Sequence, residues 1–321
     1  MVLHGVGQPL VLEDRPSLEP GEGEAVIRLR AAALNHRDVW IRKGQYAGLK
    51  FPIVLGSDGV GAVVKGPEGW VGKDVIVNPA LAWGEGEEAQ SEGFRILGLP
   101  DDGTFAEEVR VPVGNLVEKP AFLSDAQAAA LPLAGLTAYR ALFSRAKLQS
   151  GERVLVTGAG GGAASLGLRF AVAAGAEVWA TTSGAEKIAR AEAMGARKAV
   201  DYRTEGWEKA LGAEFDVILD SAGGEGFGKL IDLAAPGGRI VFFGATAGDP
   251  PAFPMRKVFW KGLSILGTTM GSPADFKALV EFVERHSLVA DVDETFPVER
   301  ANEALDRMQS GAQAGKIVLT I

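Results

Sequence analysis

From about Ser124 onward, the chain alternates short apolar runs with stretches of helical periodicity, and this alternation restricts the fold more than any other feature. The apolar runs are Arg153–Thr157, Glu177–Thr182, Lys198–Val200, Phe215–Asp220, Arg239–Phe243 and Leu263–Gly267. A strand followed by a helix, repeated in this way, is typical of a parallel sheet that carries helices on both faces. The sequence therefore predicts a doubly wound α/β domain of six strands.

Two of the intervening segments are expected to be helices, over Ala164–Ala174 and Ala185–Met194. Ser183, with Glu186 three residues later, has the spacing of a capping box at the start of the second helix. Gly195 follows its last residue, where glycine commonly ends a helix.

The first third of the chain reads instead as short strands separated by glycine-containing turns. The expected strands are Ala25–Arg30, Gly59–Val64, Asp74–Val77 and Ala106–Val111. The polar, acidic stretch Gly84–Gly93 is expected to be a surface loop. This pattern predicts a second, β-barrel-like domain.

The end of the chain returns to helical periodicity. Ser272 and Pro273 have the order of an N-cap and a first helical residue, and a further helix is expected over Val298–Met308. A last strand, Lys316–Ile321, lies far from the six apolar runs in sequence, so pattern alone does not place it.

The first apolar run leads into a glycine-rich turn and then an apolar helix. The turn residues are Gly158, Ala159, Gly160, Gly161, Gly162 and Ala163. A strand, a glycine turn and a helix in this order place a pyrophosphate at the helix N-terminus, where glycines let backbone N–H groups approach it. We therefore predict a dinucleotide site, the alternative being a tight turn in an α/β domain without ligand.

The residues at the end of the second strand indicate whether the site binds NAD or NADP. A carboxylate there would bind the ribose 2′-hydroxyl and repel a 2′-phosphate. This chain has Thr181–Gly184, which contains hydroxyls but no acid, and Lys187 follows in the next helix. Hydroxyls and a lysine suit a phosphate, so the sequence favours NADP(H), although Lys187 by itself also fits a solvated helix face.

Composition excludes several other classes of protein. The absence of cysteine removes thiolate zinc sites, iron–sulfur clusters and cysteine nucleophiles. A net charge of −8 gives no electrostatic case for nucleic acid or anionic membrane. No apolar run reaches the length of a membrane helix, and Met1–Gly5 lacks the pattern of a signal peptide. We expect a cytoplasmic protein that binds neither nucleic acid nor membrane.

Several separated motifs together resemble one known family. They are Ala33–Asp38, Leu55–Gly61, Leu131–Tyr139, the glycine turn, Asp220–Gly224, Pro236–Val241 and Gly315–Val318. With them the chain resembles the medium-chain dehydrogenase/reductase superfamily, and within it the zinc-free quinone oxidoreductase-like branch, over essentially its whole length. The resemblance implies a β-barrel-like (GroES-like) substrate domain of residues 1–120 and 272–321. The dinucleotide-binding (Rossmann) domain, residues 121–271, is inserted between these two parts.

The resemblance also assigns cofactor contacts. Ser183, Lys187 and Tyr202 fall where NADPH-using members hold the 2′-phosphate and adenosine, and Thr137 falls where the family contacts the nicotinamide ribose or amide region. Two further segments fall on loops beside the nicotinamide: Phe243, Gly244 and Ala245, and Thr268, Thr269 and Met270. The zinc ligands of the family's alcohol dehydrogenases fall on Asn35, Ser57–Asp58 and about Leu133. These residues cannot form a tetrahedral N/S site, so no metal is expected.

Without a metal or a thiol, hydride transfer to a carbonyl compound needs either another electrophilic group or a substrate that itself delocalises the negative charge. A quinone or α,β-unsaturated carbonyl delocalises the charge that hydride addition creates. Asn35 is expected to donate its amide N–H to the carbonyl oxygen, the alternative being that it only caps the turn before Asp38. Arg42 and Tyr46 are candidates for the same site, or else a surface cation and a packed aromatic.

Three functions stay open at this point. The first is an NADPH-dependent reductase of quinones or enals, the second an NADPH-binding redox sensor or binding partner with little turnover, and the third, more remote, an alcohol dehydrogenase. Leu263–Gly267 would form the edge of the doubly wound sheet. Since an apolar edge strand favours pairing, and the resemblance suggests pairing across a two-fold axis, we expect a homodimer.

Overall fold

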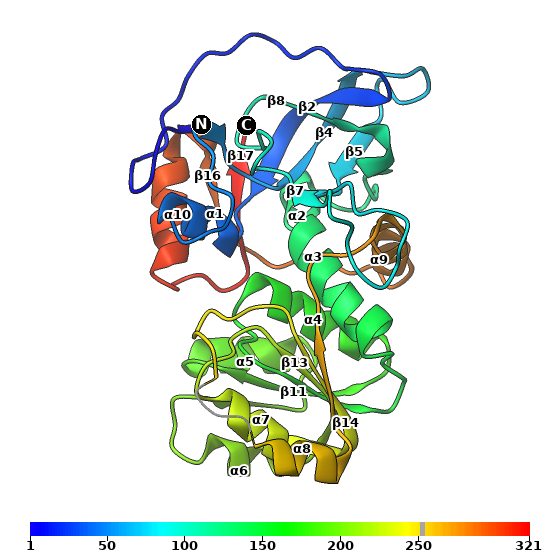
Figure 1. The fold of residues 1–321 in the computed structure, drawn as a ribbon, viewed down its shortest axis with the longest axis vertical. Coiled ribbons are helices and arrows are strands. Elements are labelled where there is room, and N and C mark those ends of the chain that lie inside the picture. The colour runs from blue at the N-terminus through cyan, green and yellow to red at the C-terminus, as the bar shows by residue number, and fades with distance from the viewer. Residues whose placement is uncertain (251–253) are drawn as a thin grey trace. The chain divides into compact units, whose positions relative to one another are not determined.

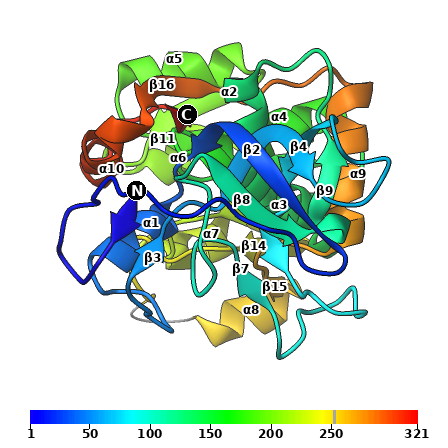
Figure 2. The same ribbon diagram turned by 90° about the horizontal axis from the view of Figure 1, so that it is seen from above.

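The computed structural model describes residues 1–250 and 254–321, and within them the chain forms two compact units (Figure 1). The first unit contains Met1–Leu136 and Gly271–Ile321, and the second contains Thr137–Met270. The second unit is thus inserted into the first along the chain. The two ends of the chain both belong to the first unit (Figure 2).

The second unit is built on a six-stranded parallel sheet, which confirms the predicted doubly wound fold. Its spatial order is β12 (Lys198–Asp201), β11 (Glu177–Thr182), β10 (Arg153–Val156), β13 (Phe215–Asp220), β14 (Ala234–Phe242) and β15 (Ser264–Gly267). The chain runs outward from β10 first in one direction and then in the other. A crevice that binds ligand is characteristic of the point where such a sheet reverses, here between β10 and β13.

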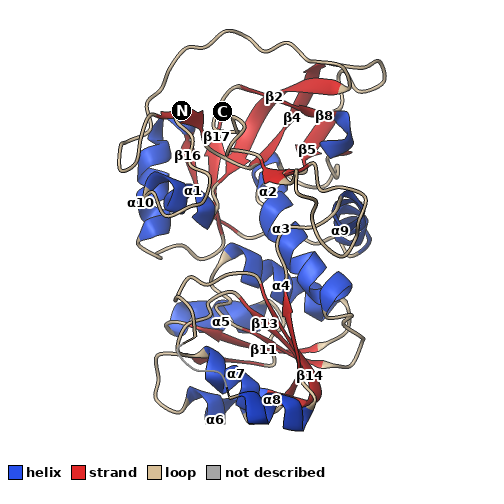
Figure 3. Cartoon of the chain, in the orientation of Figure 1, coloured by secondary structure: helices blue, strands red, loops and turns tan. Residues whose placement is uncertain are grey.

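Helices cover both faces of this sheet (Figure 3). They are α4 (Gly162–Ala173), α5 (Ala185–Ala193), α6 (Trp207–Leu211), α7 (Phe227–Leu233) and α8 (Met255–Lys261). Leu155, Ile218 and Ile240 point to one face and pack with α6 and α7 in one apolar cluster. On the other face, a Cβ at Gly167 of α4 would lie 2.5 Å from Leu219, so glycine permits the close approach of helix and strand.

The predicted start of the helix after β11, Ala185, is confirmed, but the predicted N-cap is wrong by one residue. Gly184, with a φ of +81°, is the N-cap of α5, and Ser183 does not cap it. The Gly184 N–H donates instead to the Asp201 carboxylate at 2.8 Å. An acid from the neighbouring strand therefore takes the place of the predicted local capping box. At the other end of the helix, Gly195 has a φ of +108° and follows the last turn, as predicted.

The first unit is built on a seven-stranded sheet. Six strands follow the order β16 (Val292–Pro297), β17 (Lys316–Thr320), β2 (Glu24–Ala33), β4 (Asp58–Lys65), β5 (Asp74–Val77) and β9 (Leu116–Glu118), and β8 (Glu108–Pro112) pairs with β2. The C-terminal strand, which pattern could not place, lies antiparallel to β2. Two small strand pairs, β1 (Val2–Leu3) with β3 (Ile53–Val54) and β6 (Ala80–Leu81) with β7 (Arg95–Ile96), complete the strands of this unit.

The helices of the first unit flank these sheets. They are α1 (His36–Arg42), α2 (Asp125–Ala129), α9 (Pro273–Arg285) and α10 (Ala301–Gln309), together with short 3-10 turns at Val113–Asn115 and Val298–Arg300. α3 (Pro132–Tyr139) spans the boundary and continues into a π-helix, Arg140–Arg145. Ser272 caps α9 and Pro273 is its first residue, as predicted. Among the described helices, none is both long and apolar enough to cross a membrane.

The second unit begins at Thr137, later than the predicted residue 121. α2 packs against β2 and β4, and the Leu133 N–H donates to the Asp58 carboxylate at 2.8 Å. These contacts hold residues 121–136 on the sheet of the first unit, so the boundary that the resemblance implied comes before the one in the structure.

Candidate functional site

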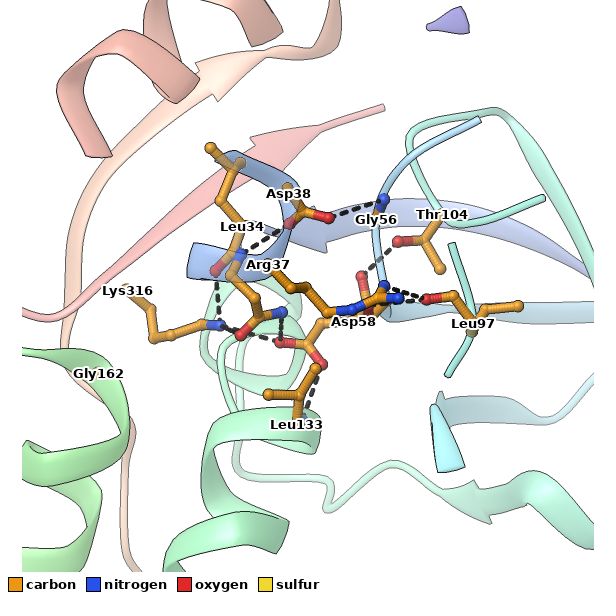
Figure 4. Close-up of polar contacts among 12 residues, drawn as sticks. Leu34, Arg37, Asp38, Gly56, Asp58, Leu97, Thr104, Leu133, Gly162 and Lys316 are labelled. Carbon is orange, nitrogen blue, oxygen red and sulfur yellow. Dashed lines mark hydrogen bonds and ion pairs between the residues drawn. The ribbon is translucent and has the colours of Figure 1, made fainter. Parts of the chain in front are cut away.

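A buried polar cluster in the first unit joins Asn35, Asp58 and Lys316, which come from three distant segments (Figure 4). Sheet pairing explains why they meet. Ala33 at the end of β2 lies opposite both Asp58 of β4 and Val318 of β17. Asn35, just beyond Ala33, is therefore brought next to the first residues of both neighbouring strands.

The ammonium of Lys316 is fully used within this cluster. Nζ donates to Asn35 Oδ1 at 2.6 Å, to the Leu34 carbonyl at 2.7 Å and to Asp58 Oδ2 at 2.9 Å. The Lys316 side chain is 4% exposed and that of Asp58 is 0% exposed. An ammonium has three hydrogens, so each of them has an acceptor.

Asp58 accepts hydrogen bonds at both carboxylate oxygens. Oδ1 accepts the Leu133 N–H at 2.8 Å, and Oδ2 accepts Asn35 Nδ2 at 3.0 Å as well as the Lys316 ammonium. A buried carboxylate is stable only when it is paired and hydrogen-bonded, and these contacts provide both.

Asn35 precedes α1, and the helix start is held by Asp38. The Asn35 backbone N–H donates to Asp38 Oδ2 at 2.8 Å, while the Asn35 side chain points to Lys316 and Asp58. Burial raises the pKa of the Asp38 carboxyl to about 6, and the charge of Arg37 and the Asn35 N–H oppose this only in part. The Asn35 side chain also faces the N3 backbone N–H in the capping box of α1, but it forms no cap hydrogen bond there, and its hydrogen bonds go to Lys316 and Asp58.

The structure does not bring Arg42 into this cluster. Its guanidinium donates to Asp306 at 2.7 Å and to Gln309 at 3.1 Å, both on α10. Tyr46 packs against Arg37 instead: the guanidinium carbon of Arg37 lies 5.1 Å from the centroid of the Tyr46 ring. Arg37 is buried and donates to Ser57 Oγ and the Leu97 carbonyl, both at 2.8 Å, so it holds the loop that carries Ser57.

Lys316 is the residue of this cluster that sequence reasoning missed. Before the structure, Lys316 was named only as part of the Gly315–Val318 motif and of the last predicted strand, and no role was assigned to its side chain. A lysine that begins a strand of buried apolar residues is the signal that could have found it, because a lysine is almost never fully buried unless it is paired.

The second unit carries the predicted glycine turn. Gly158 has a φ of +64°, the Ala159 N–H donates to the Thr181 carbonyl at 2.9 Å, and Gly161 is the N-cap of α4. A Cβ at Gly160 would lie 2.9 Å from Lys187 Cδ, so the Lys187 side chain lies against the turn. The first N–H groups of α4 have no partner within the helix and can bind an anion.

The end of β12 adds a charged pair that the sequence analysis did not consider. Asp201 lies opposite Thr182 in the sheet, and its carboxylate binds the Arg203 guanidinium at 2.7 and 3.0 Å. These bonds hold the pKa of Asp201 well below its usual range. Tyr202, between them, is 48% exposed. The preference predicted for NADP(H) depends on the end of β11 alone, whereas the adjacent strand β12 supplies an acid.

The predicted nicotinamide loops follow β14 and β15. The Phe243 N–H donates to the Asp220 carbonyl at 3.2 Å, and the Thr268 N–H donates to the Phe242 carbonyl at 3.1 Å. Thr268 Oγ1 is buried and has no hydrogen-bond partner within the part of the chain that the structure describes. In parallel sheets the strand ends share one edge, so these loops and the glycine turn lie along the same edge. Thr137 is buried at the start of this unit.

Comparison with known families gives two matches. Residues 21–121 match the alcohol dehydrogenase GroES-like domain, and residues 162–285 match the zinc-binding dehydrogenase domain. The first range contains β2, β4, β5 and β8 of the first unit. The second range begins at α4 and contains every strand of the doubly wound sheet except β10.

Individual proteins match over nearly the whole chain. A zinc-type alcohol dehydrogenase-like protein, YogA, of Leptosphaeria maculans is 35% identical over 98% of this chain and 95% of its own length. A crystal structure of an NAD-dependent alcohol dehydrogenase is 38% identical, with a TM-score of 0.94 over 100% of this chain and 98% of that one. The quinone oxidoreductase of Thermus thermophilus, solved also with NADPH, is 31% identical, with a TM-score of 0.82 over 100% and 99% of the two chains.

Proposed function

The chain belongs to the medium-chain dehydrogenase/reductase superfamily, and we propose that within it this protein is a zinc-independent oxidoreductase that transfers hydride from NADPH to a quinone or an α,β-unsaturated carbonyl compound. Oxidoreductase chemistry is common to the relatives described above. The finer assignment is carried by one observation, the buried ammonium of Lys316 against Asn35 and Asp58.

The residues aligned with zinc ligands do not fit that metal. The Asn35 carbonyl oxygen accepts from the Lys316 ammonium, and Ser57 Oγ accepts from Arg37 and donates to the Leu97 carbonyl at 2.8 Å. Leu133 offers only an aliphatic side chain. Zinc in dehydrogenases takes thiolate, imidazole and carboxylate ligands. The one carboxylate in this set, Asp58, is held by Lys316 and the Leu133 N–H, so the donor set supports chemistry without zinc.

A conjugated substrate fits a site with a neutral donor. A bound nicotinamide supplies the hydride. Asn35 donates an amide N–H to the carbonyl oxygen, which gains negative charge as hydride arrives. Because a quinone or enal spreads this charge over its conjugated system, one amide donor is a sufficient electrophilic aid.

The residues of the second unit fit a phosphorylated dinucleotide. The N–H groups that begin α4 receive the pyrophosphate. The Lys187 side chain and the Thr182 hydroxyl lie against Gly160, and Ser183, next in sequence, carries a further hydroxyl. Asp201, the acid nearest to this region along the sheet, is neutralised by Arg203. The unpartnered Thr268 hydroxyl on the predicted nicotinamide loop offers a further contact.

We expect the protein to prefer NADPH to NADH by at least about tenfold, because charge-assisted contacts contribute roughly 1.5–3 kcal/mol each. Lys187→Glu is expected to erase or reverse the preference, since it replaces a cation by an anion beside the 2′-phosphate. Calorimetric titration with both cofactors measures this, and Lys209→Glu on exposed α6 is the control that leaves it intact. Equal affinities in the unmodified protein would contradict the assignment.

The activity itself is tested by NADPH oxidation with a panel of quinones and enals, using protein treated with a chelator. Steady turnover is expected, with unchanged melting temperature and no stoichiometric zinc by elemental analysis. NADPH binding without turnover of any substrate would instead favour a redox sensor. One zinc per chain together with alcohol oxidation would contradict the proposal and support the alternative function, an alcohol dehydrogenase.

We further propose a homodimer that forms at β15. This strand is one of the two edges of the six-stranded sheet, the other being β12. The preceding helix α8 exposes Met255, Phe259 and Trp260, whose exposed fractions are 64%, 70% and 85%. Light scattering is expected to give twice the chain mass of 33.6 kDa, and Phe259→Asp with Trp260→Asp to give monomers, because charges in an apolar interface are costly. A monomeric unmodified protein at micromolar concentration would refute the proposal.

A further inference from the structure

We infer that Lys316 is a positioning residue, which fixes the orientation of the Asn35 side-chain amide and so presents its free N–H to the substrate. The inference rests on the proposed role of Asn35 as the donor to the carbonyl oxygen. It adds a residue from the far end of the chain, on β17, which reaches the site only through the pairing of β17 with β2.

The two neighbours of the amide allow one orientation. The Lys316 ammonium is only a donor, so it requires the Asn35 oxygen, which it meets at 2.6 Å. The Asp58 carboxylate is only an acceptor, so it requires the Asn35 nitrogen, which it meets at 3.0 Å. A flipped amide would place its NH₂ group against the ammonium and its oxygen against the carboxylate, both of which are repulsive.

This orientation leaves one hydrogen for a ligand. The Asn35 NH₂ group has two hydrogens and gives one to Asp58 Oδ2. The other has no acceptor within residues 1–250 and 254–321. Asn35 is 7% exposed, so its direction is set by these two contacts rather than by solvent.

Lys316 itself cannot be the donor to substrate while this arrangement lasts. Its three ammonium hydrogens go to Leu34, Asn35 and Asp58. A cation on the amide oxygen does, however, draw electron density from the nitrogen and strengthens its remaining N–H as a donor. Lys316 therefore acts through Asn35, by orientation and by polarisation.

The test removes the orienting charges without leaving a buried ion alone. In Lys316→Met combined with Asp58→Asn, both charges disappear, the side-chain volumes stay similar, and residue 58 still offers an oxygen to the Leu133 N–H. Because the oxygen of the new amide stays on the Leu133 N–H, its NH₂ group faces Asn35 and favours the flipped orientation, in which the Asn35 oxygen accepts from residue 58. We expect kcat to fall about tenfold, with little change in NADPH affinity.

A thermodynamic cycle separates positioning from other roles. The same double change in an Asn35→Ala background is expected to cause no further loss of kcat, because the donor through which Lys316 acts is already absent. Lys119→Met is the matched control: its ammonium donates to the Leu123 carbonyl at 2.6 Å, its side chain is 11% exposed, and it lies in the same unit. It is expected to keep full kcat.

A spectroscopic measurement does not depend on activity. The chain has only four asparagines, Asn35, Asn78, Asn115 and Asn302. Selective ¹⁵N-asparagine labelling therefore yields four side-chain amides, and Asn35→Ala identifies the one of interest. In the unmodified protein the hydrogen that Asn35 gives to Asp58 is expected to be displaced in shift from that of a free side-chain amide and slow to exchange with solvent. An Asn35 amide with the shifts and exchange rate of a free side chain would overturn the inference even if the variants failed to fold.

The outcomes distinguish this inference from the proposed function. If Asn35→Ala retains full kcat, the proposed role of Asn35 fails. If Asn35→Ala is slow but Lys316→Met with Asp58→Asn is at full rate, the inference about Lys316 fails alone. A further loss of kcat in the Asn35→Ala background also overturns it, because Lys316 would then act elsewhere.

Discussion

Asn35→Ala is expected to lower kcat by about 10–100-fold. Loss of one donor to a developing oxyanion costs on the order of 100–1000-fold, and a conjugated substrate, which spreads its charge, moves the effect to the low end. The contact strengthens in the transition state, so kcat falls more than KM rises. NADPH affinity is expected to stay nearly constant, because the predicted cofactor residues lie in the second unit whereas Asn35 lies in the first.

A structural role for Asn35 predicts a different result. Alanine retains the backbone N–H that donates to Asp38 but removes the side-chain half of the capping box. The lost contacts are those to Lys316 and Asp58, and their loss lowers the melting temperature. Asn78→Ala is the matched control, because Asn78 is also a buried asparagine of the first unit and its side chain accepts the Ala80 N–H at 3.0 Å. A destabilised Asn35→Ala enzyme with full kcat would exclude the catalytic role.

The sequence predicted the central strands of the second unit well because they are buried on both faces. Such strands appear as continuous apolar runs, and Glu177–Thr182 and Phe215–Asp220 coincide with β11 and β13 to the residue. The glycine turn followed by α4 was equally recognisable, since both the turn and the helix depend on neighbouring residues.

The features that sequence reasoning missed depend on contacts between distant residues. Ser183 has the spacing of a cap, but Asp201 on the next strand takes the Gly184 N–H. Lys316 meets Asn35 only because β17 pairs with β2, and no local pattern encodes that register. The charge balance of the Asn35, Asp58 and Lys316 cluster was therefore invisible until the sheet of the first unit was known.

The same cluster predicts the largest effect on stability. Lys316→Met alone is expected to destabilise the fold by about 3–5 kcal/mol, because removal of one partner leaves a buried charge uncompensated. Asp58 is 0% exposed, so water cannot replace the lost ammonium. For a unit of this size, the loss corresponds to a fall in melting temperature of roughly 6–20 °C.

The second partner provides the control for this prediction. Lys316→Met combined with Asp58→Asn is expected to recover most of the melting temperature, since a neutral pair of similar volume carries no uncompensated charge. Thermal unfolding of the unmodified protein, both single variants and the double variant measures the coupling between the two sites. Additive losses in the double variant would show that the ammonium does not compensate Asp58. A strong recovery of stability together with a persistently low kcat is the combination expected if this buried pair serves the orientation of Asn35 rather than the stability of the fold.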